Sequence, residues 1–191
     1  MASRSHVTAR VDPSLVRAAV NHFPGPPWDV YRPPHEPRAD WGLQPSMAGV
    51  YAFLFPRELL PKVLEVRMYR GQVTAGGDRP EEVLLRYDVA EVQGGIAESF
   101  VAYVGRTTDL LRRLRWHFSI VESTTAAQVR KGLEAAMEVG REGASEFMRE
   151  HATVVLLHAG LSGLKNTANR DAIECSLVGR YMPPFNIKAE R

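Results

Sequence analysis

The chain has a single cysteine, Cys175, among its 191 residues. One thiol excludes an internal disulfide framework and any zinc module built from several cysteines. Long apolar runs are also missing. None approaches the roughly 18 residues of a membrane span, and no apolar run follows a basic N-terminal segment as it would in a signal peptide. We therefore expect a protein of the reducing cytoplasm with no membrane contact.

Charge of one sign is not in large excess either. Lys and Arg number 24 and Asp and Glu number 22, and a net charge of +2 does not by itself indicate a nucleic-acid partner. The segment 106–118, however, carries four arginines and only one acid, Asp109. Such a segment suits a phosphate backbone, although a solvated helix face is the common alternative for a run of charge.

The N-terminal part, residues 1–45, predicts a short helix followed by an arm. Asp12 and Pro13 give a helix start signal. Seven prolines in 24–45 predict an extended connector packed on the surface, because proline fixes φ and lacks a backbone donor. Three aromatic residues of the arm are expected to attach it to the domain: Trp28, Tyr31 and Trp41.

The remaining part, residues 46–191, predicts one α/β domain: a small, mostly antiparallel sheet flanked by helices. The apolar pattern indicates strands at 47–55, 63–73, 82–92, 98–105 and 152–158. It also indicates a helix capped by Thr107 or Thr108 and running through His117, helical structure over 126–150 broken near Gly140 and Gly143, and a last helix over 169–181. A turn at 75–80 would make the second and third strands a β-hairpin, inserted within about 56–98.

Two tyrosine motifs lie in apolar strands of this domain. They are Gly49-Val50-Tyr51 and Tyr103-Val104-Gly105, and the basic segment follows the second directly. Far downstream, Glu174 and Asn186 lie on either side of a Met-Pro-Pro-Phe stretch. This ordered set resembles the GIY-YIG nuclease superfamily, whose two tripeptides read here as GVY and YVG. The resemblance covers roughly residues 47 to 55 and 99 to 188.

Helical spacing places the candidate residues at the border of the core. At about 100° per residue, Arg113 and His117 stack beside the apolar arc of their helix. In the last helix, Glu174 falls within the apolar arc, where a carboxylate is costly unless a partner or a metal compensates it. Without the resemblance, Arg113 would be an arginine at the edge of the core and Glu174 would pair with Arg170.

The resemblance implies hydrolysis of DNA phosphodiesters with one Mg²⁺ or Mn²⁺, held by Glu174. Arg113 would bind the scissile phosphate, since its planar fork keeps its charge and presents paired donors. Tyr51 would accept the proton of the attacking water, and whether Tyr51 or His117 is the general base stays open. Tyr103 would orient the phosphate or the water.

Further residues are candidates for substrate binding. A glycine beside each tyrosine, Gly49 and Gly105, would let the DNA backbone approach closely. Arg106 and Arg112 would add phosphate contacts, and Asn186 would tie the C-terminal loop to the wall of the site.

The missing second domain favours a stand-alone endonuclease, restriction-like or defence-like. The residues that recognise the DNA target are expected in 56–100 and 119–150. The alternatives are a repair or structure-selective nuclease, or a non-catalytic DNA-binding or assembly module on the same fold. Besides DNA, a second copy of the chain is a candidate partner, forming a homodimer.

Overall fold

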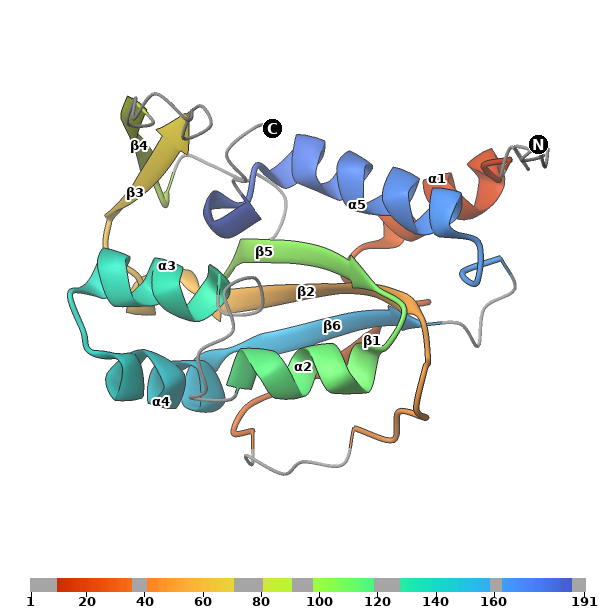
Figure 1. Cartoon of the computed structure of the whole chain (residues 1–191), viewed down its shortest axis with the longest axis horizontal. Helices are drawn as coiled ribbons and strands as arrows, with labels where there is room; N and C mark the ends of the chain where they lie inside the picture. Colours follow the sequence, from red (N-terminus) through yellow and green to blue (C-terminus); the bar gives the residue numbers. More distant parts are fainter. Residues whose placement is uncertain are drawn as a thin grey trace, which may run out of the picture.

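Figure 1 shows the computed structural model, which describes residues 10–35, 41–70, 81–90, 98–118, 128–158 and 163–186. The helices in this part of the chain are α1 (Pro13–His22), α2 (Leu110–Phe118), α3 (Gln128–Met137), α4 (Arg141–His151) and α5 (Thr167–Tyr181). The strands are β1 (Asp29–Tyr31), β2 (Gly49–Pro56), β3 (Val63–Arg70), β4 (Glu81–Asp88), β5 (Ser99–Thr107) and β6 (Thr153–His158). Two short 3₁₀ turns are η1 (Arg57–Leu59) and η2 (Pro184–Asn186). None of the described helices combines the length and apolarity that a membrane crossing requires.

The predicted α/β class and antiparallel sheet are confirmed. Four strands form one sheet in the order β1-β6-β2-β5, and every neighbouring pair is antiparallel. The other two described strands, β3 and β4, pair only with each other. The strand that carries Tyr51, β2, is therefore central, between β5 and β6.

Helices cover both faces of this sheet (Figure 1). The first face, here called the α2 face, lies against α2, α3 and α4, and the second, the α5 face, lies against α1 and α5. Side chains of a strand alternate between faces. In β2 the odd-numbered Tyr51, Phe53 and Phe55 join the core of the α2 face. The even-numbered side chains of the strand join the core of the α5 face: Val50, Ala52 and Leu54.

A β-bulge in β5 changes this alternation. Phe53 pairs with Tyr103, but the next residue of β2, Leu54, pairs with Val101, so Ala102 is the extra residue. Because one extra residue shifts the phase by one, Tyr103 joins the α2 face together with the even-numbered Phe100. The bulge therefore brings Tyr103 to the face that carries Tyr51.

The N-terminal arm is more than the surface connector expected from its prolines. Its segment β1 pairs with β6 and forms an edge of the sheet. The two tryptophans, Trp28 and Trp41, are both buried, as expected, but in different cores: the first on the α5 face and the second on the α2 face. Tyr31 donates a hydrogen bond to the carbonyl of Trp41 at 3.1 Å. The arm thus wraps around the sheet edge.

The inserted hairpin is confirmed, and its second strand ends at Asp88, before the expected end at residue 92. Val63 pairs with Asp88 and Arg70 with Glu81, so β3 and β4 form a two-stranded antiparallel ribbon. The hairpin extends from the body beyond α3 (Figure 1). Its base is fixed by two buried residues, Leu64 and Val89. The predicted turn at 75–80 lies outside the described residues.

Two predicted helix starts are wrong because polar side chains cap the helices at other residues. Asp109, not a threonine, caps α2: its Oδ1 accepts the amide of Arg112 at 3.0 Å. Asn166 caps α5 through the amide of Ala168, and the helix therefore starts at Thr167, two residues before the expected start. The expected break is present at Gly140, but Gly143 lies inside α4.

Gly49 opens β2 at a point where no side chain fits. A Cβ built there would lie 2.3 Å from the carbonyl oxygen of Leu157, which belongs to the neighbouring strand. We expect Gly49→Ala to lower the free energy of unfolding by about 1–3 kcal/mol, the usual cost of overpacking. Urea unfolding checks this. Gly179→Ala, on an open surface of α5, is the matched control and should stabilise slightly. Equal stability of the two variants would contradict the packing argument.

Candidate active site

The hydroxyl of Tyr51 is the centre of the candidate site. Burial on the α2 face leaves none of the side chain exposed. Arg113 donates from Nε to this hydroxyl at 2.9 Å. The hydroxyl also lies 2.9 Å from Nε2 of His117. Three of the predicted catalytic residues, from β2 and α2, are therefore joined by hydrogen bonds.

The packing of α2 places Arg113 and His117 at this hydroxyl. Leu110 and Leu114 are fully buried in the core of the α2 face and fix the rotation of the helix. Residues four apart lie on the same side of a helix, so Arg113 and His117 both reach the hydroxyl from one side. The predicted border position holds for Arg113, which is partly buried, whereas His117 is fully buried.

Tyr103 completes an aromatic cluster around the hydroxyl. Its ring centre lies 5.9 Å from that of Tyr51 and 5.5 Å from that of His117. Gly105 pairs with Tyr51 across the sheet, and a Cβ there would lie 2.7 Å from both tyrosine rings. Gly105 therefore supplies the space that the two tyrosine side chains occupy.

Burial and charge set the protonation states in this cluster. Burial raises the pKa of Tyr51 well above its usual value near 10, and Tyr103 adds to the shift, while Arg113 opposes it. Burial and the neighbouring charge of Arg113 lower the pKa of His117 to about 3. Burial also acts to lower the pKa of Arg113, but interactions with Tyr51 and Tyr103 outweigh it and raise this pKa. At neutral pH the cluster thus holds a neutral phenol, a neutral imidazole and a guanidinium.

These states allow the Tyr51 hydroxyl to donate to His117. In the tautomer that accepts, Nε2 of neutral His117 takes the hydrogen bond and Nδ1 carries the ring proton. Within the described part of the chain, this Nδ1 is buried without a hydrogen-bond partner. In this tautomer the phenol proton is directed at the imidazole.

Glu174 lies on the other side of the sheet edge, against the α5 face. Its partner is not Arg170 but Arg106, whose Nε lies 2.8 Å from Glu174 Oε2. The same Nε lies 2.7 Å from Asp171 Oδ1, an ion pair without hydrogen-bond geometry. Arg170 donates instead to the carbonyls of Leu164 and Lys165. Because Arg106 follows Gly105 directly in β5, the carboxylates and the tyrosine cluster lie beside neighbouring residues of one strand, on opposite faces of the sheet.

The donor set around Glu174 fits a largely hydrated hard cation. No group of three or more His, Cys, Asp or Glu residues is clustered in the described segments, so an enclosed metal site is absent from them. Mg²⁺ retains several waters and needs only one or two carboxylates. Glu174 and Asp171 would supply these, and the Asp171 oxygen that lacks a hydrogen bond is a suitable ligand atom.

Asn186 holds the C-terminal segment against the site, as predicted. The amide of Val104 donates to Asn186 Oδ1 at 2.5 Å, and Asn186 Nδ2 donates back to the Val104 carbonyl. These two bonds fix η2 along β5, between the two tyrosine-motif residues Tyr103 and Gly105. The side chain is therefore a positioning element.

The sequence did not single out Asp171, although a signal was present. Asp171 precedes Glu174 by three residues, a spacing that brings two side chains together on a helix. Arg112, expected at the substrate, points away from the tyrosine cluster and stacks on Trp116, with 4.7 Å between its guanidinium carbon and the ring centre.

No family model, no curated protein and no solved structure matches this chain.

The low pKa of His117 predicts a pH-dependent stability. In the unfolded state His117 has its usual pKa near 6.5, whereas in the folded state its pKa is about 3. The unfolded state therefore binds this proton first, and the folded state loses stability as the pH falls from 6.5 toward 3. From pH 7 to pH 5 the free energy of unfolding should fall by about 2 kcal/mol through this residue alone. His117→Gln keeps an acceptor for Tyr51 and should remove this part of the decrease in urea unfolding. His22→Gln, on exposed α1, is the control and should follow the wild type. An unchanged pH profile of His117→Gln would contradict the proton assignment.

Proposed function

We propose that this protein is a GIY-YIG-like endonuclease that hydrolyses phosphodiester bonds of DNA with Mg²⁺ or Mn²⁺. One observation carries the proposal: the hydroxyl of Tyr51 is held between Nε of Arg113 and Nε2 of His117. Tyr103 packs beside Tyr51, and Glu174 and Asn186 follow in the chain order that the superfamily shows. A restriction-like or defence-like role is part of this proposal.

Arg113 supplies the positive charge for the scissile phosphate. Its raised pKa keeps the guanidinium charged at any relevant pH. Its position at the border of the core leaves it partly exposed, next to Tyr103 and Gly105. A planar guanidinium suits the charge that develops on phosphate oxygens in the transition state.

The hydrogen bonds of Tyr51 suggest a proton relay. A neutral phenol with a high pKa is a poor base by itself, but it can accept a proton from water while passing its own to Nε2 of His117. Burial, and after it the charge of Arg113, lowers the pKa of His117 and so opposes its protonation in the free protein. A phosphate bound to Arg113 would compensate that charge and make His117 easier to protonate. The relay is thus favoured when substrate is present.

The carboxylates would hold the metal. A bound Mg²⁺ or Mn²⁺ supplies Lewis-acid stabilisation of the phosphate. Glu174, with Asp171 beside it, would supply the ligands, and Arg106 would turn from them toward the DNA backbone. The ion pairs of Arg106 in the free protein keep the two carboxylates compensated until then.

Cleavage of supercoiled plasmid and of branched duplexes, in Mg²⁺ and in EDTA, tests the proposal. Glu174→Ala should reduce cleavage at least about 10³-fold, since lost metal stabilisation removes several kcal/mol. DNA affinity should stay nearly unchanged because a carboxylate contributes little to backbone binding. Glu146→Ala, exposed on α4, is the matched control and should cleave normally. Metal-dependent cleavage by Glu174→Ala would contradict the assignment of Glu174 as the metal ligand. A wild type that binds DNA but does not cleave it would favour the non-catalytic alternative.

Removal of the Tyr51 hydroxyl tests the relay. Tyr51→Phe should fold normally and reduce the rate of cleavage by about 10²–10⁴, the range expected for a general base. Single-turnover cleavage with saturating enzyme separates this loss from weaker binding. His117→Gln should lose about as much, because the amide still accepts from Tyr51 but cannot take its proton. If Tyr51→Phe is mild and His117→Gln severe, the base is His117 rather than Tyr51.

A further inference from the structure

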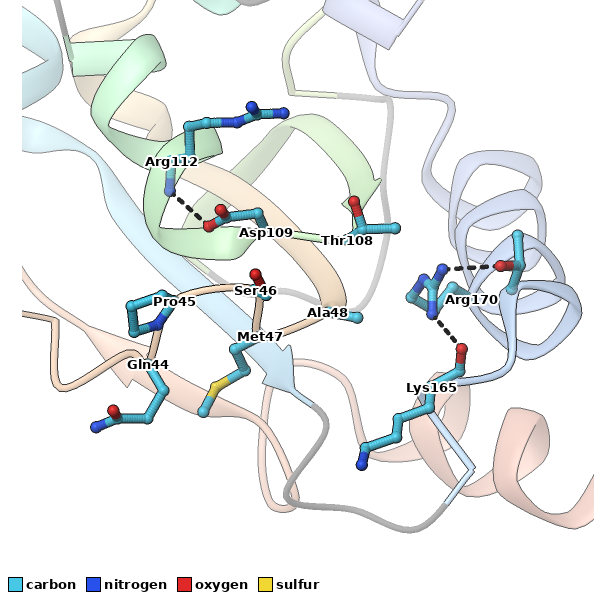
Figure 2. A pocket seen from close by; sticks show the side chains of 11 residues that line it. Gln44, Pro45, Ser46, Met47, Ala48, Thr108, Asp109, Arg112, Lys165 and Arg170 are labelled. Atoms are coloured by element: carbon cyan, nitrogen blue, oxygen red, sulfur yellow. Dashed lines mark hydrogen bonds between the residues drawn. The ribbon is translucent and has the colours of Figure 1, made fainter.

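A basic cavity lies at the end of the sheet where β2 begins and β5 ends. It has a volume of about 760 Å³ and lies between the N-terminal turns of α2 and α5. Figure 2 shows Asp109 and Arg112 on one side of it and Lys165 and Arg170 on the other. Cavities of this size hold ligands as large as a nucleotide.

The charge of the cavity favours an anion. Three cations line it, and its one described acid, Asp109, caps α2 through the Arg112 amide. Lys165 and Arg112 are exposed, so their charges reach solvent. The first turn of α5 contains no acidic residue, and the cap at Asn166 is neutral, so the positive end of this helix dipole also faces the cavity.

A buried cation in the wall gives a second, independent indication. Arg170 is only 2% exposed, and its terminal nitrogens donate to two loop carbonyls and to Thr167 Oγ1. Its Nε has no hydrogen-bond partner among the described residues. Burial and the neighbouring Arg106 act to lower the pKa of Arg170, and Asp171 compensates only in part. The wall therefore carries positive charge that the described protein groups do not fully compensate.

We infer that this cavity binds the phosphate group of a nucleotide, with Lys165 as its direct contact. The inference rests on the proposed function for the source of that phosphate, a DNA strand that also reaches Arg113. Arg112 and Arg113 are adjacent in α2, and Ala48 of the cavity precedes Tyr51 by three residues. Three residues of a strand span about 10 Å. One DNA strand can therefore contact both places within a few nucleotides, since its phosphates rise about 3.4 Å apart.

Charge reversal at Lys165 tests the inference by binding alone. In EDTA, where no cleavage occurs, the affinity of Lys165→Glu for a labelled oligonucleotide should fall at least about fivefold, with a salt slope smaller by about 1. Arg17→Glu, exposed on α1, makes the same charge change and is the control. It should change the affinity and the salt slope only as much as the lower net charge of the protein does. Lys165→Arg should bind like the wild type. Thermal unfolding by circular dichroism confirms that each variant is folded.

Free nucleotide distinguishes the two sources of phosphate. Deoxyadenosine monophosphate is titrated to about 10 mM into labelled protein, with deoxyadenosine as the ligand without phosphate. Backbone amide shifts of Thr108 and Thr167 report on the cavity. If the monophosphate shifts these amide signals and Lys165→Glu abolishes the shifts, the cavity binds the phosphate of a free nucleotide. If Lys165→Glu lowers only the affinity for the oligonucleotide, the cavity binds a phosphate of a DNA strand. If Lys165→Glu changes neither the amide shifts nor the affinity for the oligonucleotide, the inference is wrong.

These outcomes are independent of catalysis. A wild type that cleaves no DNA, yet binds oligonucleotide through Lys165, would contradict the proposed function and support the phosphate cavity. Cleavage that depends on Glu174, with binding insensitive to Lys165, would support the function and contradict the cavity.

Discussion

The burial of β2 on both faces is the constraint on which the rest of the structure depends. Every residue of this strand from Gly49 to Phe55 is buried, so each side chain must belong to one of two cores. Tyr51 belongs to the α2 face, and its polar hydroxyl must therefore find partners inside the protein. Arg113 and His117 are those partners. The same residues that satisfy the buried phenol are the ones to which the proposed hydrolytic site assigns roles.

The two cationic residues of the site are both occupied by protein groups in the free protein. Arg113 contacts Tyr51, and Arg106 contacts Glu174 and Asp171. A phosphate between the tyrosine cluster and the carboxylates would compete for both guanidinium groups. Its charge would compensate Arg113 and release the carboxylates from Arg106 for a hydrated cation. Substrate and metal would thus reinforce each other without any large movement of the backbone.

The sequence predicted the local features well and the long-range ones in part. Period-two and helical patterns located β2, β5, β6, α2 and α5, because their apolar faces are locally encoded. The bulge at Ala102 is not visible in the pattern, since its cause is the pairing with β2. The role of β1 as an edge strand was missed for the same reason: only β6 supplies its hydrogen bonds. The apolar arc of α5 correctly indicated that Glu174 needs a partner, but the partner comes from β5, 68 positions away.

The position of Gly105 and Arg106 explains how one strand can serve both halves of the site. Successive residues of β5 point to opposite faces, so Gly105 makes room for the tyrosines while Arg106 reaches α5. Asn186 holds the outer edge of β5 at Val104, directly before these two residues. The edge is thus covered up to the point where substrate would approach. A side chain at position 105 would displace the two tyrosine rings, so glycine there lets Tyr51 keep its contact with Arg113 while Arg106 reaches α5.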